Sequence, residues 1–545
     1  PQARTKPPRR MLLLPTKQIR RSFAAAKLQR DFRHRALWAW ISSGDVELSP
    51  LTAARGRFGQ WMATIYDLHG AARLLDWDRE TLMPPKGADP RGLQVATLRA
   101  VRHRETLQDG IDDDMALIEA QGDPSEAERA MVALARHERL RAGKVPESLV
   151  RAHGEALSAG LTSWLANREA GDFTAFAPAL TKVVALTREI GEALEIGAEP
   201  YDGLLDDYEP GATTAELEAL FGDLGPQLAT IVDGAQMMPP DAPFHGRAWP
   251  DAAQLAVAED VARMVGFDMD GGLIAQSAHP FTDTPHRGDV RFTTRIAPGD
   301  PTANVLVTLH EAGHALYAQG LPEAHARTFV YGSPSLGADE SQSRFFENHL
   351  GRRLAFWEHL HPTLVARFGS SMDGLGPHDL VRTVTRVQRG WCRVDADEVT
   401  YDLHIILRFE LELALIRGSL AVADLPEAWR DASERLLHIT PDGDAQGCMQ
   451  DIHWAWGMFG YFPTYTLGNM YAAQLADALE AAEGPLDDLI RANRLDVVLA
   501  FMRSRVHEPG SRVPTRILME QATGRPFSTK PFLRRITQLA ATAGT

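Results

Sequence analysis

A long apolar segment that contains two histidines places the strongest constraint on how this chain folds. The segment VLVTLHEAGHALYAQGL, residues 305–321, carries His310 and His314 four positions apart, with Glu311 between them. Residues four apart lie on the same face of an α-helix, so this spacing predicts that both imidazoles point in one direction. Because the segment is apolar nearly all round, we expect the helix to be buried in the protein core.

Two histidines and a carboxylate on a buried helix need polar partners, and a metal ion supplies them. His310 and His314 are therefore predicted metal ligands, whereas Glu311 can reach a water molecule on such an ion without being a ligand. The alternative is a pair of solvent-facing histidines on an amphipathic helix. The apolar residues around the pair argue against that alternative.

The third metal ligand must come from elsewhere in the chain. The extended zinc motif HExxHxxGxxH requires a glycine and a histidine where this chain has Tyr317 and Gly320, so that class of site is excluded. A catalytic zinc also accepts two histidines and one glutamate, with water in the fourth position. In the segment GADESQSRFFENHLGR, Glu340 is the first candidate, and Glu347 and Asp339 remain as alternatives.

The rest of the chain is predicted to be mostly helical. Segments such as PSEAERAMVALARHERLRAG and TAELEALFGDLGPQLATIV place apolar residues three and four positions apart, behind Ser or Thr caps. The strand-like segment DVRFTTRI, residues 289–296, is an exception that precedes the two histidines. No stretch reads as a domain linker. We therefore expect one large helical domain over residues 46–545, with a small β element beside the histidine helix.

Positive charge is concentrated at the start of the chain. Residues 1–36 contain eleven Lys and Arg against Asp31 alone, a balance of +10, so the net charge of −15 leaves −25 for the remainder. An acidic body repels phosphates, and we predict that nucleic acid is not a partner. For residues 1–45 the composition leaves two hypotheses: a disordered extension or early start site, and an organellar targeting segment.

Hydropathy and cysteine content predict a protein of the cytoplasm without a membrane partner. No apolar run approaches the roughly 18 uncharged residues that a membrane span needs. Cys392 and Cys448 are too few for a disulfide framework in 545 residues, which suits a reducing compartment.

The sequence HEAGHALY followed by ESQSRFFEN resembles the carboxypeptidase Taq family of zinc peptidases. Further segments match the family in its order between residues 50 and 540: WDRETLMPPKGA (77–88), PYDGLLDDYEPG (200–211), HPF (279–281), DVRFT (289–293), RVDADEVTY (393–401), GCMQDIHW (447–454) and GYFPTYTLGN (460–469). The resemblance implies a large helical metallopeptidase with a deep active-site groove. It also implies zinc, or cobalt in its place, and a homodimer that removes C-terminal residues from peptides with broad specificity.

The same resemblance assigns roles to residues of this chain. His310, His314 and Glu340 are the implied metal ligands, and Glu311 is the implied general base. Tyr401 occupies the position at which this group of enzymes keeps a tyrosine that donates a hydrogen bond to the developing oxyanion. The chain departs from the family pattern at Asp339, where the family usually has a histidine before the ligand glutamate.

A carboxypeptidase must also bind a free C-terminal carboxylate, and an arginine binds it with two parallel donors. Arg393 and Arg291 stand in family motifs and are the candidates, with Gln450 and His453 as hydrogen-bonding neighbours. For each of them, a structural role such as a salt bridge is the alternative interpretation.

Two other functions remain open from the sequence. A zinc endopeptidase or a dipeptidyl-releasing peptidase would use the same scaffold. A non-enzymatic helical interaction protein would retain the site as a relic, although the intact HExxH motif and Glu340 argue against this hypothesis.

Overall fold

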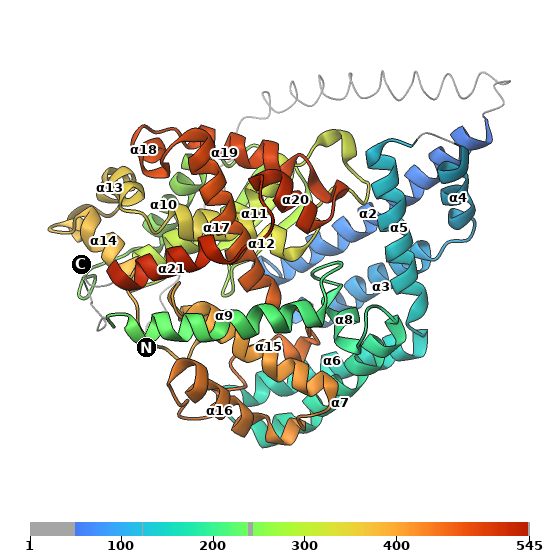
Figure 1. Cartoon of the computed structure of the whole chain (residues 1–545), viewed down its shortest axis with the longest axis horizontal. Helices are drawn as coiled ribbons and strands as arrows, with labels where there is room; N and C mark the ends of the chain where they lie inside the picture. The colour runs from blue at the N-terminus through green and yellow to red at the C-terminus, as the bar shows by residue number, and fades with distance from the viewer. Residues whose placement is uncertain (1–48, 122–123, 238–242, 543–545) are drawn as a thin grey trace, which may run out of the picture.

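The structure, a computed structural model, describes residues 49–121, 124–237 and 243–542, and most of them are helical (Figure 1). The predicted extension, residues 1–45, lies outside the described residues. The helices before the sheet are α2 (Pro50–Thr81), α3 (Ala88–Thr106), α4 (Ile111–Gln121), α5 (Glu126–Lys144), α6 (Glu147–Asn167), α7 (Phe173–Leu194), α8 (Pro200–Leu205), α9 (Thr214–Gly234) and α10 (Asp251–Met264). Those after it are α11 (Pro301–Gly320), α12 (Leu336–Arg344), α13 (Leu354–Phe368), α14 (Pro377–Val384), α15 (Tyr401–Arg417), α16 (Leu425–Leu437), α17 (Pro463–Glu483), α18 (Leu486–Arg491), α19 (Leu495–Met502), α20 (Thr515–Thr523) and α21 (Lys530–Thr542).

The predicted helix starts are confirmed where the caps are strong. At the start of α5, the Ser125 hydroxyl accepts a hydrogen bond from the Glu128 amide at 3.2 Å, and the Glu128 carboxylate accepts from the Ser125 amide at 3.0 Å. Thr213 and Glu216 form the same reciprocal pair at the start of α9. Each pair satisfies backbone donors that the first helical turn leaves free.

A small β element lies beside the histidine helix, as the sequence predicts, and the structure shows it to be a three-stranded sheet. Its strands are β1 (Gly272–Gln276), β2 (Thr282–His286) and β3 (Asp289–Thr294), in the order β1-β3-β2. The central strand β3 pairs with β1 in parallel, Gly272 opposite Val290, and with β2 in antiparallel, Thr282 opposite Phe292. Only β3 was predicted from the sequence, because β1 and β2 are short and lack a clear apolar alternation.

Helix α11 carries the HExxH motif and is buried on nearly all sides, as predicted. Fifteen of its twenty residues are buried, and the Thr308 hydroxyl contacts the Thr294 hydroxyl of β3 at 3.0 Å. On the opposite side, α12 approaches so closely that a side chain at Gly313 would meet the backbone of Gln342 and Ser343 at 2.6 Å. A glycine is needed there because no Cβ atom fits between the two helices.

Helix α17 encloses α12 from its other side. A Cβ atom at Gly468 would meet the Glu340 side chain at 2.6 Å, so the glycine of the TLGN segment allows α17 to pack directly on this residue. Helix α12 is thus held between α11 and α17, and this packing fixes Glu340 relative to the two histidines.

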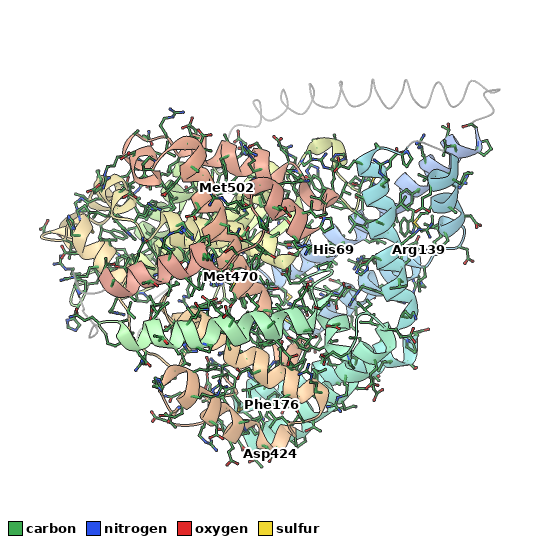
Figure 2. The ribbon with its side chains drawn as sticks, in the orientation of Figure 1. His69, Arg139, Phe176, Asp424, Met470 and Met502 are labelled. Atoms are coloured by element: carbon green, nitrogen blue, oxygen red, sulfur yellow. The ribbon has the colours of Figure 1, made fainter. Side chains whose placement is uncertain are left out.

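The apolar core has two parts. The larger joins α6 through α21 and includes Phe176 and Met470, which Figure 2 labels. A smaller cluster around Phe58, Trp61 and Met115 lies between α2, α4 and α5. In Figure 1 helices α2 to α5 form one end of the molecule. The single-domain organisation and the deep groove stay predictions.

Among the described residues, no helix has both the length and the apolar character that a membrane crossing requires.

Candidate active site

The packing of α11 against α12 brings three potential metal ligands together. Nε2 of His314 lies 3.4 Å from Oε2 of Glu340, and Nε2 of His310 lies 3.9 Å from the same oxygen. One ligand atom from each residue lies within 4.8 Å of the other two. The predicted spacing on α11 therefore places both imidazoles on one face, opposite a carboxylate that approaches from a second helix.

The outer nitrogens of the two histidines contact the alternative candidates Glu347 and Asp339. Nδ1 of His310 hydrogen-bonds Oε2 of Glu347 at 2.9 Å, and Nδ1 of His314 lies 2.9 Å from Oδ2 of Asp339. The Glu347 carboxylate can only accept, so Nδ1 of His310 carries the hydrogen and Nε2 of His310 keeps its lone pair for a cation. Nδ1 of His314 faces Asp339 at ion-pair distance without a hydrogen bond. Asp339, which departs from the family pattern, is thus a partner of His314 beside the ligand group.

The three residues fit a divalent metal ion. Two imidazole nitrogens and one carboxylate oxygen form the donor set that zinc accepts in catalytic sites, and carboxylates behind the imidazoles orient them. Burial opposes ionisation of Glu340, but Arg344 and the two histidines outweigh it and hold its pKa well below the usual range. Because the Glu340 carboxylate stays ionised beside the two imidazoles, it favours the binding of a cation at this position.

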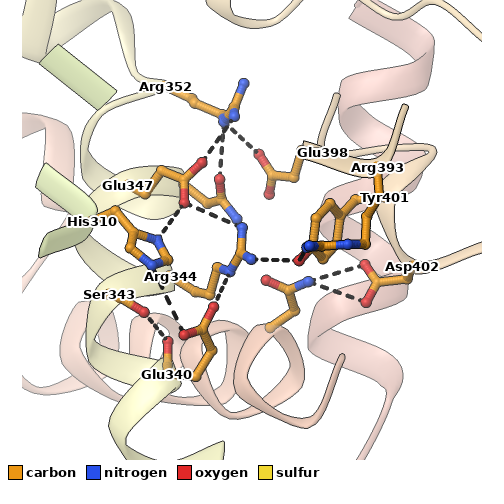
Figure 3. Close-up of polar contacts among 12 residues, drawn as sticks. His310, Glu340, Ser343, Arg344, Glu347, Arg352, Arg393, Glu398, Tyr401 and Asp402 are labelled. Carbon is orange, nitrogen blue, oxygen red and sulfur yellow. Dashed lines mark hydrogen bonds and ion pairs between the residues drawn. The ribbon is translucent and has the colours of Figure 1, made fainter. Parts of the chain in front are cut away.

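Arg344 connects this ligand group to Tyr401 (Figure 3). Its Nε donates to Oε1 of Glu340 at 2.6 Å, its Nη1 to Oε2 of Glu347 at 3.2 Å, and its Nη2 to the Tyr401 hydroxyl at 2.8 Å. Sequence reasoning missed this residue. The available signal was its position four residues after Glu340, on the same helical face and inside the ESQSRFFEN segment.

Glu311 is buried beside the ligand group without being one of the three convergent ligands. Oε2 of Glu311 accepts a hydrogen bond from the Thr282 hydroxyl at 2.7 Å, which fixes the carboxylate from strand β2. Burial raises the pKa of Glu311, although His310 and His314 oppose that shift. Thr282 was also missed, because the sequence does not reveal that β2 lies against α11.

Tyr401 lies at the start of α15 and receives two guanidinium donors. Besides Arg344, Nη1 of Arg393 donates to the Tyr401 oxygen at 3.2 Å. Because both contacts use the phenol oxygen as an acceptor, the hydroxyl hydrogen is left free to donate. Burial raises the pKa of Tyr401 despite the two positive neighbours, so the phenol keeps its hydrogen.

Arg393 is itself held by Asp451 of the GCMQDIHW segment. Its Nε and Nη2 lie 3.0 and 2.8 Å from Oδ1 of Asp451, and Arg408 occupies the other oxygen at 2.7 Å. Oε1 of Gln450 accepts from the Arg393 backbone amide at 3.0 Å. The structure therefore brings Arg393 and Gln450 together beside Tyr401, and it ties most of the Arg393 guanidinium to a buried carboxylate.

His453 and Arg291 have different surroundings. His453 packs on the Phe462 ring, with centroids 4.6 Å apart, and its Nε2 lies 3.4 Å from the Tyr465 hydroxyl. Burial lowers the pKa of His453 to about 3, so the imidazole is neutral. Arg291 pairs with Asp289 of its own strand at 2.6 and 2.9 Å, and within the described residues it has no hydrogen bond to the Arg393 group.

Glu209 supports the start of the ligand helix from behind. It accepts hydrogen bonds from the Gly337 amide and, at 2.9 Å, from the Thr464 hydroxyl. Burial raises its pKa to about 7. The PYDGLLDDYEPG segment therefore contributes the residue that connects α12 to α17.

The profile of the carboxypeptidase Taq (M32) metallopeptidase family matches residues 57–539. The chain belongs to this family. Its membership makes the protein a metallocarboxypeptidase and confirms the resemblance that the HEAGHALY and ESQSRFFEN segments indicate.

Similarity to relatives and to solved structures of the family extends over most of the chain. Thermostable carboxypeptidase 1 of Thermus thermophilus is 40% identical over 84% of this chain and 93% of its own length, and carboxypeptidase 1 of Bacillus subtilis is 34% identical over 83% and 91%. The M32 carboxypeptidase from Deinococcus radiodurans superposes with a TM-score of 0.86 at 32% identity, covering 90% of this chain and 100% of its own. Metallocarboxypeptidase 1 of Trypanosoma cruzi gives a TM-score of 0.84 at 33% identity, covering 90% and 99%. The family fold is therefore present nearly complete.

Proposed function

We propose that this metallocarboxypeptidase uses zinc, held by His310, His314 and Glu340, to remove C-terminal residues from peptides with broad side-chain tolerance. The observation that carries the proposal is the approach of Nε2 of both histidines to one oxygen of Glu340, with carboxylates on the two outer nitrogens. When bound there, such an ion lowers the pKa of water and polarises a carbonyl. Cobalt has the same requirement for nitrogen and oxygen ligands and is the alternative metal.

Glu311 is the proposed general base. Its carboxylate takes a proton from the attacking water and later delivers it to the leaving amine. The hydrogen bond from Thr282 occupies one lone pair of Oε2 and fixes the direction of the carboxylate, at 2.7 Å. Burial raises the pKa of Glu311. Its carboxylate is therefore a stronger base than the carboxylate of an exposed glutamate.

Tyr401 is the proposed donor to the developing oxyanion. Arg344 and Arg393 both donate to the phenol oxygen of Tyr401, at 2.8 and 3.2 Å. These contacts polarise the O–H bond and leave the hydroxyl hydrogen directed away from the two guanidinium groups. A donor that is already oriented contributes without reorganising during the reaction.

Arg393 is the preferred anchor for the C-terminal carboxylate of the substrate, with Arg291 as the alternative. Gln450 and His453 are proposed as hydrogen-bonding neighbours. Arg393 is adjacent to Tyr401, so a carboxylate at Arg393 lies near the proposed oxyanion donor. Arg291 is more accessible, with 26% of its side chain exposed, but it pairs with Asp289.

The proposal is tested by mass spectrometry of the products from an unblocked peptide. A ladder shortened one residue at a time from the C-terminus, abolished by a chelator and restored by zinc, is the expected result. Loss of dipeptides would favour the dipeptidyl-releasing alternative, and internal cleavage would favour the endopeptidase. The absence of metal-dependent cleavage would favour the non-enzymatic hypothesis. Glu311→Gln is the matched control for contaminating peptidases.

The proposal includes a homodimer in the cytoplasm. The homodimer rests on the family resemblance, and the location rests on the scarcity of cysteine. Light scattering after size exclusion should give twice the chain mass of 60.0 kDa. A single-chain mass at micromolar concentration would contradict the dimer, and fractionation of the native cell tests the location.

A further inference from the structure

A cavity of about 460 Å³ lies at the carboxyl end of α11. It is formed by the segment after α11, the β2–β3 turn and the π-helical segment Arg503–His507 that follows α19. No proposed metal ligand, base or substrate anchor lines it. Its charged and polar lining residues are Arg287, Gln319, His325, Arg503, Glu508 and Arg512.

The charge of this cavity is opposite to that of the protein as a whole. Three arginines line it, against Glu508 alone. Outside the lining, Glu323 lies 4.0 Å from Nε of Arg287, and its side chain is 63% exposed. An excess of guanidinium groups around a concavity attracts an anion.

Most of the guanidinium donors in the cavity are uncommitted. Arg287 donates from Nη1 to the Leu321 carbonyl at 2.9 Å, and Arg512 donates to the carbonyls of Pro509 and Glu508 at 2.9 and 3.0 Å. Nε of Arg503 is buried and has no hydrogen-bond partner among the described residues. An arginine carries five N–H donors, and a buried donor without a partner is costly, so these groups favour a ligand rich in acceptors.

The walls of the cavity are fixed by the fold. The Gln319 side chain exchanges two hydrogen bonds with the Asp268 backbone, at 2.9 and 2.8 Å. A Cβ atom at Gly320 would meet the His507 ring at 2.3 Å, so helix α11 packs tightly on the segment that carries Arg503. A ligand would therefore enter a preformed site and would not have to order it.

Two histidines near the cavity add no positive charge to it. Burial and Arg512 lower the pKa of His325, and burial together with Arg503 lowers the pKa of His507 to about 3. Both imidazoles are neutral at pH 7, so the charge of the cavity comes from the arginines.

We propose that this cavity binds a phosphate dianion, either free or as the monoester of a small organic molecule. A tetrahedral phosphate offers three oxygens to guanidinium groups that approach from three segments, whereas a planar carboxylate offers two. The cavity is large compared with the volume of about 30 Å³ that one water occupies, so it has space for an organic group beside the phosphate. Neither the peptidase chemistry nor the proposed peptide anchor requires this site.

The test is isothermal titration calorimetry of the zinc-loaded full-length protein, with the probes compared at one ionic strength and the phosphate titration repeated at higher salt. The probes are inorganic phosphate, ribose 5-phosphate, ribose and succinate. We expect one molecule of phosphate or of ribose 5-phosphate to bind per chain. Binding should weaken as the salt concentration increases, and ribose should not bind. Arg503→Gln and Arg512→Gln should each weaken phosphate binding by about tenfold or more. The matched control is Arg505→Gln, which removes one exposed charge from the same helical turn and should bind as the wild type does.

Several results would overturn the proposal. These are a wild type that binds neither phosphate compound at millimolar concentration, equal binding of succinate and phosphate, or binding that both pocket variants retain in full. Tighter binding of ribose 5-phosphate than of inorganic phosphate identifies an ester as the ligand class, and equal binding identifies free phosphate. Peptidase activity of the variants checks that they fold, because none of the substituted residues belongs to the proposed catalytic machinery.

Discussion

Arg344 and Tyr401 are joined by a hydrogen bond of 2.8 Å from the guanidinium Nη2 to the phenol oxygen. The same guanidinium contacts Glu340 at 2.6 Å, so one side chain connects a proposed metal ligand to the proposed oxyanion donor. A change at either end of this connection should therefore affect both metal binding and catalysis.

Arg344→Lys should weaken both functions. Lysine keeps the charge but cannot reach Glu340, Glu347 and Tyr401 together, so we expect zinc affinity to fall about 10–100-fold, as for other partners of metal ligands. The turnover number of the zinc-saturated enzyme should fall as well, because Tyr401 loses a fixed neighbour. Chelator competition and kcat at saturating zinc measure the two effects separately. Arg353→Lys is the control, since Arg353 pairs with Glu480 and Asp487, both at 2.9 Å. Unchanged zinc affinity in Arg344→Lys would refute this positioning role.

Glu340→Ala and Glu347→Ala should differ in metal content. Glu340 faces Nε2 of both histidines, so its removal should abolish stoichiometric zinc binding. Glu347 contacts the outer nitrogen of His310, and its removal should leave zinc bound about 10–100-fold more weakly. Zinc content after dialysis distinguishes the two. If Glu347→Ala loses all metal and Glu340→Ala keeps it, Glu347 is the ligand.

Glu311→Gln should retain zinc and lose nearly all activity. The substitution preserves size but cannot accept a proton, and general base catalysis typically contributes about 10²–10⁴-fold. Thr282→Val is a milder companion, because it removes the 2.7 Å hydrogen bond that orients the base and leaves the base itself. We expect its kcat to fall less than that of Glu311→Gln. Activity near the wild-type level in zinc-loaded Glu311→Gln would exclude this residue as the base.

The sequence predicted the parts of the site that depend on local spacing. His310 and His314 are four residues apart on one helix, and their common orientation follows from helical geometry alone. The position of Glu340 opposite them depends on the packing of α12 between α11 and α17, which Gly313 and Gly468 make possible. That packing is not encoded in any local pattern, and the family resemblance was needed to choose Glu340 over Glu347.

The contacts across long sequence separations could not be predicted in this way. Thr282 reaches Glu311 because strand β2 pairs with β3 and lies against α11, and Asp451 reaches Arg393 across 58 residues. The helix periodicity and the strand at DVRFTTRI were predicted from the sequence, whereas β1 and β2 carry too weak an alternation to be recognised.

Glu412 should make the stability of the protein depend on pH. It is fully buried and accepts hydrogen bonds from Tyr201, from Trp454 at 3.0 Å and from the Gly460 amide at 3.0 Å. Burial raises its pKa to about 7, above the value of an unfolded glutamate. The folded state therefore binds the proton more tightly, and this contribution to stability is present at low pH and is lost as pH rises from about 4.5 to 7.

The measurement compares the thermal midpoints of wild type and Glu412→Gln from pH 5 to pH 8. Glutamine does not titrate, so the stability advantage of the wild type should shrink across this range by on the order of 1–3 kcal/mol. Other buried carboxylates, including Glu209, are present in both proteins and cancel in the difference. A constant or growing advantage toward pH 8 would mean that the three donors keep Glu412 ionised.

The last prediction concerns the preference for a free carboxylate at the end of the substrate. Arg393 lies beside Tyr401, and its loss would leave the substrate charge without a paired donor, which typically costs about 2–5 kcal/mol. We expect the wild type to hydrolyse a peptide acid far faster than its amide, and Arg393→Ala to lose most of that preference. Arg393→Lys keeps a charge next to Asp451 and should recover stability but little of the preference, because lysine lacks the paired donors. The measured quantity is kcat/KM for the acid and the amide, with Arg291→Ala as the control. A preference lost only in Arg291→Ala would move the anchor to strand β3, and equal rates for acid and amide in the wild type would favour the endopeptidase.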